Sequence, residues 1–387
     1  MWRYYPAGTD GLRFSPRVRT PLPPFFSMPV RFPAPASWWR VLTTLLMALA
    51  AALLCVWLRT PIPWMIGPLV VISLVSMVGV PTESWTPFRN TGQWVIGTAL
   101  GLYFTPEVGA LIAGLGWAIA LGVIWALGLG LGFGVWLRHL HAGRLAGVDA
   151  EQLRITSYFS GAIGGASEMT LIAERQGART DLVAAAHSLR VLLVTVTIPF
   201  AMQLWGVGPL DLVTLGVREV LPDGLAALGG LTLIGALVMR RLGRANPWFM
   251  GALLVTLLVT LAGVQFSAIP GWMSAGAQLF IGVSLGVRFT PAFVHTAPRW
   301  LASVGVGSVL MMGLCAGFGW VMAWWTGLHP ATMVLGTSPG GIAEMSITAK
   351  VLQLGVPVVT AFQVCRLVAV LVLAEPVFHW WNSRRVP

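Results

Sequence analysis

Charged side chains are scarce in this 387-residue chain: Asp, Glu, Lys and Arg together make up 10% of it, whereas apolar residues make up 56%. The mean hydropathy is +0.79. A soluble protein needs enough polar surface to cover its core, and this chain lacks the residues to provide one. The scarcity of charge excludes the soluble classes and indicates a polytopic, all-α membrane protein whose first partner is the lipid bilayer.

Cysteine and histidine are also few. The three cysteines, Cys55, Cys315 and Cys365, lie in apolar segments without paired or metal-ligand spacing, which argues against disulfides and a zinc site. Of the six histidines, only His139 and His141 are close in sequence. We therefore expect no metal site and no cofactor, and we do not expect an enzyme.

Acidic residues number 13 against 24 basic ones, which gives a net charge of +11. Most basic residues lie between apolar segments, so a cytoplasmic bias of Arg and Lys in membrane loops explains the charge without a nucleic-acid partner. No helix-turn-helix or zinc-binding reader is recognisable in the sequence.

The apolar segments form two series of five. They lie at roughly 39–58, 62–80, 91–104, 108–137 and 182–204, and then at roughly 223–239, 247–264, 272–287, 300–325 and 356–378. Several are short for a hydrocarbon core of about 30 Å, so tilted or broken helices are expected.

The two series are copies of one another. GQWVIGTALGLYFTP, starting at Gly92, matches AQLFIGVSLGVRFTP, starting at Ala277, and PWMIGPL from Pro63 matches PWFMGAL from Pro247. A repeat of this length, roughly 180 residues, is typical of duplicated transporters rather than of solenoids.

A glycine-rich string occurs once in each copy: SGAIGGASEMTLIAE at 160–174 and TSPGGIAEMSITAK at 337–350. We expect its Gly-Gly pairs to let the backbone turn inside the membrane and to start a new helix whose positive end attracts anions. A kinked, packed helix without a ligand is the alternative. The candidate residues of the two turns are Gly164, Gly165, Gly340, Gly341, Pro339, Ser160 and Ser338.

Each string carries a carboxylate, Glu168 or Glu344, and an arginine follows 22 residues later, Arg190 or Arg366. A carboxylate costs a few kcal/mol within the bilayer and is usually retained there to bind an ion or proton. The alternative is a structural salt bridge between each Glu and its Arg. Arg190 lies too deep in its helix to reach water, so it needs either Glu168 or a substrate anion as its partner.

Three further polar residues are candidates for the same cavity. Gln93 and Gln278 begin matching helices, each of which contains a Gly-xxx-Gly pair typical of close helix packing. His187 precedes Arg190 by one helical turn and is a candidate proton carrier, with a hydrogen-bonded core histidine as the alternative.

The distribution of basic residues favours one topology. If the Gly-Gly segments are re-entrant, each half has five crossings, the second half is inverted, and only Arg59, Arg218 and Lys350 lie outside, whereas loop arginines such as Arg89 and Arg288 lie on the cytoplasmic side. Both termini are then cytoplasmic. If the Gly-Gly segments span the membrane instead, the Arg240–Arg244 cluster is exported.

We expect five regions along the chain. Residues 1–37 form a disordered cytoplasmic tail, within which Met28 is an alternative start, 38–205 the first membrane repeat, 206–222 a linker, 223–380 the second repeat, and 381–387 a cytoplasmic tail. The sequence does not decide the oligomeric state, and a homodimer is one arrangement that it permits.

The strings SGAIGGASEMTLIAERQGA with HSLRVLLV, and TSPGGIAEMSITA with FQVCRL, resemble the membrane AbrB-type duplication family of bacteria over about residues 39–380. The resemblance implies a location in the inner membrane and a fold similar to inverted-repeat transporters. Family members are labelled as regulators of gene expression or as ammonia monooxygenases, without an established biochemistry for either label.

Three functions can be compared. A secondary transporter coupled to H⁺ or Na⁺, carrying a small anion or carboxylate, explains the duplication, the glycine turns and the buried charges together. A monooxygenase needs a metal site that the scattered histidines do not provide. A regulator needs a reader domain, and the N-terminal tail is the one sizeable candidate.

Overall fold

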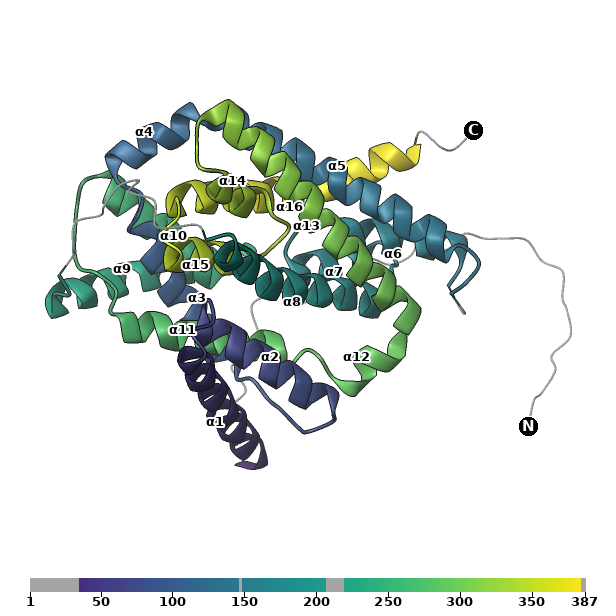
Figure 1. The fold of residues 1–387 in the computed structure, drawn as a ribbon, viewed down its shortest axis with the longest axis horizontal. Helices are drawn as coiled ribbons and strands as arrows, with labels where there is room; N and C mark the ends of the chain where they lie inside the picture. Colours follow the sequence, from purple (N-terminus) through teal and green to yellow (C-terminus); the bar gives the residue numbers. More distant parts are fainter. Residues whose placement is uncertain (1–34, 146–147, 207–218, 384–387) are drawn as a thin grey trace, which may run out of the picture. The chain divides into compact units, whose positions relative to one another are not determined.

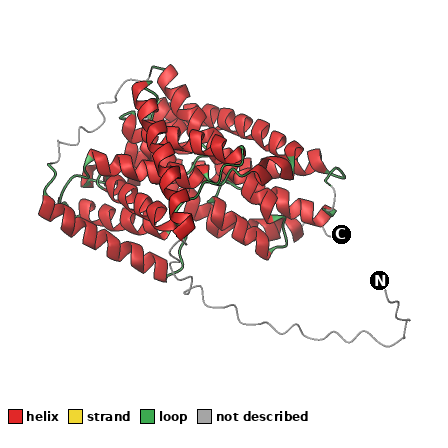
Figure 2. Ribbon diagram, turned by 90° about the horizontal axis from the view of Figure 1, so that it is seen from below, coloured by secondary structure: helices red, strands yellow, loops and turns green. Residues whose placement is uncertain are grey.

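The computed structural model describes residues 35–145, 148–206 and 219–383. Within these ranges the chain forms helices and loops and no strand (Figures 1 and 2). The predicted all-α class of a polytopic membrane protein is confirmed. Most of the expected N-terminal tail, residues 207–218 of the expected linker and residues 384–387 lie outside the described residues, as does Met28.

The helices of the first half are α1 (Pro35–Trp57), α2 (Pro63–Met77), α3 (Thr86–Gly101), α4 (Pro106–Gly114), α5 (Gly116–His141), α6 (Ala150–Gly161), α7 (Ala166–Arg175) and α8 (Thr180–Leu204). Those of the second half are α9 (Pro222–Arg241), α10 (Pro247–Leu261), α11 (Gly271–Gly286), α12 (Pro291–Thr296), α13 (Pro298–Thr326), α14 (Pro330–Thr337), α15 (Ile342–Val351) and α16 (Val356–Ser383).

The helix order of the first half recurs in the second, from α1 with α9 to α8 with α16. The correspondence extends to the backbone. Ile62 and Asn246, which precede the Pro that opens α2 and α10, both adopt the left-handed conformation with φ of 47°. That conformation is unusual for a β-branched residue, so its presence in both halves marks a conserved detail of the duplicated backbone rather than a random deviation.

The helices form two groups. α1 packs on α2, α9 packs on α10, α2 packs on α11 and α3 packs on α10 and α11, which joins these six helices into one group. The second group contains α5, α6, α7 and α8 with α13, α14, α15 and α16, whose main contacts are to one another. Fewer contacts connect the groups, chiefly through α15 and α16 against α3.

Glycines make the close contacts of the first group. A Cβ atom on Gly97 of α3 would lie 2.4 Å from the carbonyl oxygen of Phe249 in α10, and a Cβ atom on Gly282 of α11 would lie 2.7 Å from that of Met65 in α2. The two Gly-xxx-Gly pairs thus lie at corresponding helix contacts, where the backbones approach without an intervening side chain.

One predicted segment, 108–137, is wrong as a single helix. α4 ends at Gly114 and α5 begins at Gly116, with Leu115 between them. α4 itself is bent by 88° from α3. Thr105 accepts a hydrogen bond from the Val108 amide and Pro106 occupies the first helical turn, so local N-terminal signals begin α4 directly after α3. The break at Leu115 has no side-chain cap, and apolar residues continue through it, so a hydropathy scan does not detect it.

Six described helices are long and apolar enough to cross a membrane: α1, α5, α8, α9, α13 and α16. The bent pair of α3 and α4 would make a seventh, and α2 and α10 are apolar but have 15 residues each. The ten crossings and the re-entrant character of the Gly-Gly segments stay predictions.

The packing predicts that Gly97→Ala lowers the free energy of unfolding by about 1–3 kcal/mol or more, because the added methyl overlaps a backbone carbonyl that cannot move away. Gly276→Ala on α11, where a Cβ atom would meet no atom within 4 Å, is the matched control. It should leave stability unchanged or raise it by up to about 1 kcal/mol. Thermal unfolding of the detergent-solubilised proteins measures both, and equal effects would contradict the packing assignment.

Candidate functional site

Each half of the chain contains one helix that is interrupted at its Gly-Gly pair. α6 ends at Gly161 and α7 begins at Ala166, and α14 ends at Thr337 and α15 begins at Ile342. The last turn of a helix leaves carbonyl groups without intrahelical donors. In an apolar protein interior those carbonyls require other donors, since an unsatisfied backbone group costs about 1–3 kcal/mol.

Arg190 of α8 provides donors at the first break. Its Nη2 donates to the carbonyl of Ala162 at 2.9 Å, and its Nη1 donates to those of Ser160 and Gly161 at 3.3 and 3.4 Å. The side chain is 2% exposed. A guanidinium suits this position because it has five donors and carries a positive charge at the negative end of a helix.

Arg366 of α16 does the same at the second break. Its Nη1 donates to the carbonyl of Ser338 and its Nη2 to that of Gly340, at 2.5 Å for the second bond. The side chain is 6% exposed. Arg190 and Arg366 therefore cap equivalent broken helices.

The carbonyl bonds correct the expectation that these arginines need a carboxylate or a substrate as their partner. Among the described residues the ion pairs are Arg154–Glu151 and Arg179–Asp181, and neither Arg190 nor Arg366 belongs to one. Sequence reasoning did not consider the backbone as an acceptor, although a helix break inside an apolar segment always creates free carbonyls.

The residues that precede each arginine by one turn support the same breaks. His187 Nε2 donates to the carbonyl of Phe159 at 3.0 Å, and its Nδ1 accepts from Arg190 at 2.8 Å. At the equivalent place Gln363 donates to the carbonyls of Leu335 and Gly336 at 2.8 and 3.2 Å. Both nitrogens of the fully buried His187 are thus engaged, which matches the core-histidine interpretation.

The Gly-Gly pairs are needed for space rather than for a special backbone conformation. Gly165 and Gly341 have φ of −65° and −79°, which any residue can adopt, so the turn at these two positions does not require the conformational freedom of glycine. A Cβ atom at either position would lie 2.1 or 2.0 Å from Oε2 of Glu168 or Glu344. Each carboxylate thus lies directly over the second glycine of its own motif.

The first glycine of each pair makes room for a methionine. A Cβ atom on Gly164 or Gly340 would lie 2.8 Å from Cγ of Met169 or Met345, respectively. Both methionine side chains are fully buried. The string Gly-Gly-x-x-Glu-Met therefore encodes one compact turn. In each copy the first glycine lies against the methionine and the second glycine lies against the glutamate.

The glutamates occupy the third position of α7 and α15, where the helix dipole favours negative charge. Glu344 is buried, with 8% of its surface exposed, whereas Glu168 is half-buried. The two halves therefore offer their carboxylates different access to solvent.

A cavity of about 130 Å³ lies between the two Gly-Gly turns. Ten of the predicted residues line it: Gln93, Gly164, Gly165, Glu168, Arg190, Pro339, Gly340, Gly341, Glu344 and Arg366. Four do not belong to its lining: Ser160, Ser338, Gln278 and His187. All four are buried, and Ser338 Oγ donates to the carbonyl of Leu335 at 2.9 Å.

Sequence reasoning missed five polar residues of the cavity: Arg89, Ser167, Asn246, Ser284 and Arg288. The topology argument counted Arg89 and Arg288 only as loop charges of the cytoplasmic side. None of the five is duplicated, since their counterparts in the aligned repeats are Ser274, Ala343, Ile62, Ala99 and Tyr103. Polar residues that interrupt an otherwise repeated apolar pattern were the signal that could have found them.

The cavity wall is positively charged. It contains four arginines and two glutamates, so its formal charge is +2 when all six are ionised. Arg288 is close enough to interact electrostatically with Glu344 and Glu168. The N-termini of α7 and α15 also point their positive ends at the Gly-Gly turns. The wall is thus suited to an anion.

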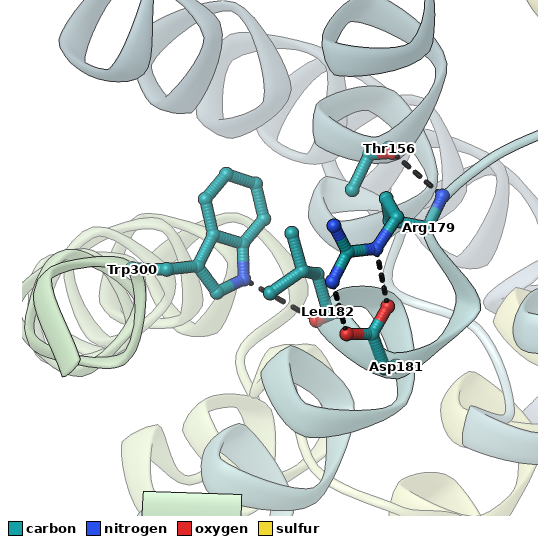
Figure 3. Close-up of polar contacts among 5 residues, drawn as sticks. All are labelled: Thr156, Arg179, Asp181, Leu182 and Trp300. Carbon is teal, nitrogen blue, oxygen red and sulfur yellow. Dashed lines mark hydrogen bonds and ion pairs between the residues drawn. The ribbon is translucent and has the colours of Figure 1, made fainter. Parts of the chain in front are cut away.

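A polar cluster fixes the start of α8, and with it the position of Arg190 (Figure 3). The Arg179 amide donates to Thr156 Oγ1 of α6 at 3.0 Å, and the Arg179 guanidinium binds both oxygens of Asp181. Trp300 of α13 donates to the carbonyl of Leu182 at 3.3 Å. These bonds join α8 to α6 and α13.

The family model described as "Transition state regulatory protein AbrB" matches residues 64–382. The chain belongs to the AbrB family. The match includes both broken helices and every lining residue of the cavity, and it confirms the resemblance drawn from the paired strings.

The chain is also similar in sequence to two bacterial proteins. "Uncharacterized protein YhjN" of Bacillus subtilis (strain 168) is 26% identical over 351 residues, which are 82% of this chain and 87% of that protein. "Putative regulator AbrB" of Escherichia coli (strain K12) is 24% identical over 353 residues, 90% of this chain and 98% of that protein. The AbrB family similarity therefore extends over nearly the whole chain.

The carbonyl bonds of Arg366 predict that Arg366→Lys lowers the free energy of unfolding by about 1–3 kcal/mol, because an ammonium cannot replace the two-pronged contact. Thermal unfolding in detergent measures the loss, with Arg240→Lys on exposed Arg240 as the control. A stability equal to that of the unsubstituted protein would show that the guanidinium does not hold the break.

Proposed function

We propose that the chain is a secondary transporter of the bacterial inner membrane, with cytoplasmic termini, that carries a small anion or carboxylate coupled to H⁺ or Na⁺. The observation that carries the proposal is the cavity between two equivalent broken helices, one from each half, with six ionisable side chains in its wall. Non-helical backbone at membrane depth is tolerated where it lines a cavity, and broken helices of this kind hold substrates and ions in transporters.

The helix directions support an inverted repeat. Phe88 of α3 stacks on Phe280 of α11, and a Cβ atom on Gly92, one turn further along α3, would lie 2.7 Å from the carbonyl oxygen of Ala277, one turn earlier in α11. α3 and its counterpart α11 therefore run in opposite directions. An inverted pair is the arrangement that gives each side of a membrane an equivalent route to one central site.

The two helix groups supply different walls of the cavity. Gln93 of α3 and Ser284 of α11 come from the first group, and the two Gly-Gly turns come from the second. A relative movement of the groups would open the cavity to one side and then to the other. The sparse contacts between them make that movement less costly than separation of helices within either group.

The family description and the name of one relative, "Putative regulator AbrB", point to a regulatory role as a second function. Those names describe the relatives and not this chain. The described residues of this chain form two groups of helices around a charged cavity. An effect on gene expression through solute transport would reconcile the label with the proposed carrier.

Glu168→Gln and Glu344→Gln are each expected to abolish or uncouple anion uptake, because the neutral amide cannot take up the coupling H⁺ and lacks the negative charge that attracts Na⁺. Proteoliposomes supplied with labelled acetate, lactate, succinate or phosphate, with and without Na⁺ and pH gradients, provide the assay. Glu174→Gln, on the exposed side of α7, is the matched control and should keep full uptake. Uptake at the unsubstituted rate in both cavity variants would remove the carboxylates from the coupling step.

The inverted arrangement predicts that cysteines placed at Arg144 and at Arg240 react with a membrane-impermeant thiol reagent from the same, cytoplasmic side. Inside-out and right-side-out vesicles separate the two sides. Labelling of the two positions from opposite sides would contradict the inverted repeat, whatever the substrate.

A further inference from the structure

The polar residues of the cavity fall into two sets. Duplicated residues, the Gly-Gly pairs, the glutamates and the capping arginines, occupy equivalent places in both halves. The unduplicated residues are Arg89, Ser167, Asn246, Ser284 and Arg288, and the equivalent places in the other half lie at Ser274, Ala343, Ile62, Ala99 and Tyr103. The residues of the second set come from separate places along the chain and still line one cavity.

The two sets also differ in what their polar atoms do. The guanidinium groups of Arg190 and Arg366 are committed to backbone carbonyls through their Nη atoms, and their Nε atoms have no hydrogen-bond partner. The guanidinium groups of Arg89 and Arg288 form no hydrogen bond or ion pair with any residue that the structure describes. Arg89 and Arg288 therefore bring their full donor capacity to the cavity, up to five N–H groups each.

Asn246 supplies a neutral polar group next to these arginines. Its Oδ1 is buried and has no hydrogen-bond partner among the described residues. An Asn amide offers both donors and acceptors, so it can bind a polar ligand atom of either kind. Ser284 is buried in the same wall, with its hydroxyl donating to the carbonyl of Ile281 at 2.9 Å and with no described residue donating to its oxygen.

Size and charge restrict the ligand. A volume of about 130 Å³ is below the range of about 300–1,000 Å³ typical of sites for drug-sized ligands, so the ligand is small. The formal charge of +2 in the wall favours two negative charges over one. Two uncommitted guanidinium groups, from α3 and from the end of α11, can each take one carboxylate through a pair of parallel hydrogen bonds.

We propose that Arg89 and Arg288 bind the two carboxylates of a small dicarboxylate in this cavity, with Asn246 contacting the chain between them, while the duplicated glycines and capping arginines build the frame. The proposal rests on the transport function proposed above and names its substrate class. The site is asymmetric although its frame is repeated, so the ligand takes one orientation relative to Glu168 and Glu344.

The test compares succinate with succinamate, which has nearly the same shape and one carboxylate fewer. Isothermal titration of the full chain in lipid nanodiscs should give an affinity for succinate at least about tenfold higher than for succinamate, because a bidentate charged pair is lost. Sulfate, a compact dianion, should also bind more weakly than succinate. Equal affinities for succinate and succinamate, or tighter binding of sulfate, would overturn the proposal.

Arg89→Gln and Arg288→Gln should each weaken succinate binding about tenfold or more and remove the preference over succinamate. Arg240→Gln, an exposed arginine outside the cavity, is the control and should bind succinate normally. Unchanged succinate binding in both cavity variants would contradict the assignment.

Asn246→Ile gives a second line of evidence if an arginine variant fails to fold. Ile62 has the same backbone conformation at the equivalent place, so isoleucine is compatible with this turn. The variant should weaken succinate and succinamate by the same factor of a few, because the lost contact is uncharged; no change would count against the site. If succinate does not bind but another anion is taken up, the dicarboxylate site is contradicted and the transport function is not. If succinate binds but no anion is taken up, the transport function is contradicted and the dicarboxylate site is not.

Discussion

The capping of broken helices by buried guanidinium groups is the interaction on which the site depends. Without Arg190 and Arg366, the carbonyls at the ends of α6 and α14 would lack donors inside an apolar protein, and the helices could not stop where they do. Because they stop, α7 and α15 can begin at the Gly-Gly turns with their positive ends facing one cavity. Arg190 and Arg366 thus satisfy the backbone carbonyls and also contribute two positive charges to the cavity wall.

The repeated residues make the frame symmetric, and the polar residues without a counterpart make the cavity asymmetric. Each half supplies one broken helix, one carboxylate folded over its own glycine and one capping arginine. Only one half carries each of Arg89, Asn246 and Arg288. A symmetric frame suits a site that must be reached equally from both sides of a membrane, whereas an asymmetric lining suits a ligand with a fixed orientation.

The sequence was sufficient to predict the all-α class, the two breaks, and the presence of Glu168, Glu344, Arg190 and Arg366 near them, because charge inside an apolar segment is conspicuous. It did not reveal the acceptors of the arginines, since hydrogen-bond partners depend on which atoms folding brings together. The break at Leu115 was missed because apolar residues continue through it, so hydropathy shows one segment. Arg89 and Arg288 were missed because a loop position looks the same whether it faces solvent or a cavity.

Alternating access of the cavity is the most direct test of the account. Ser284, in the cavity wall, can be replaced by Cys in a chain whose three native cysteines are Ser. In oriented vesicles, a membrane-impermeant thiol reagent should modify this cysteine from either side, because one population of molecules opens the cavity to each side in turn. Modification from one side only, under every gradient applied, would contradict a transporter and leave a binding pocket that never crosses the membrane.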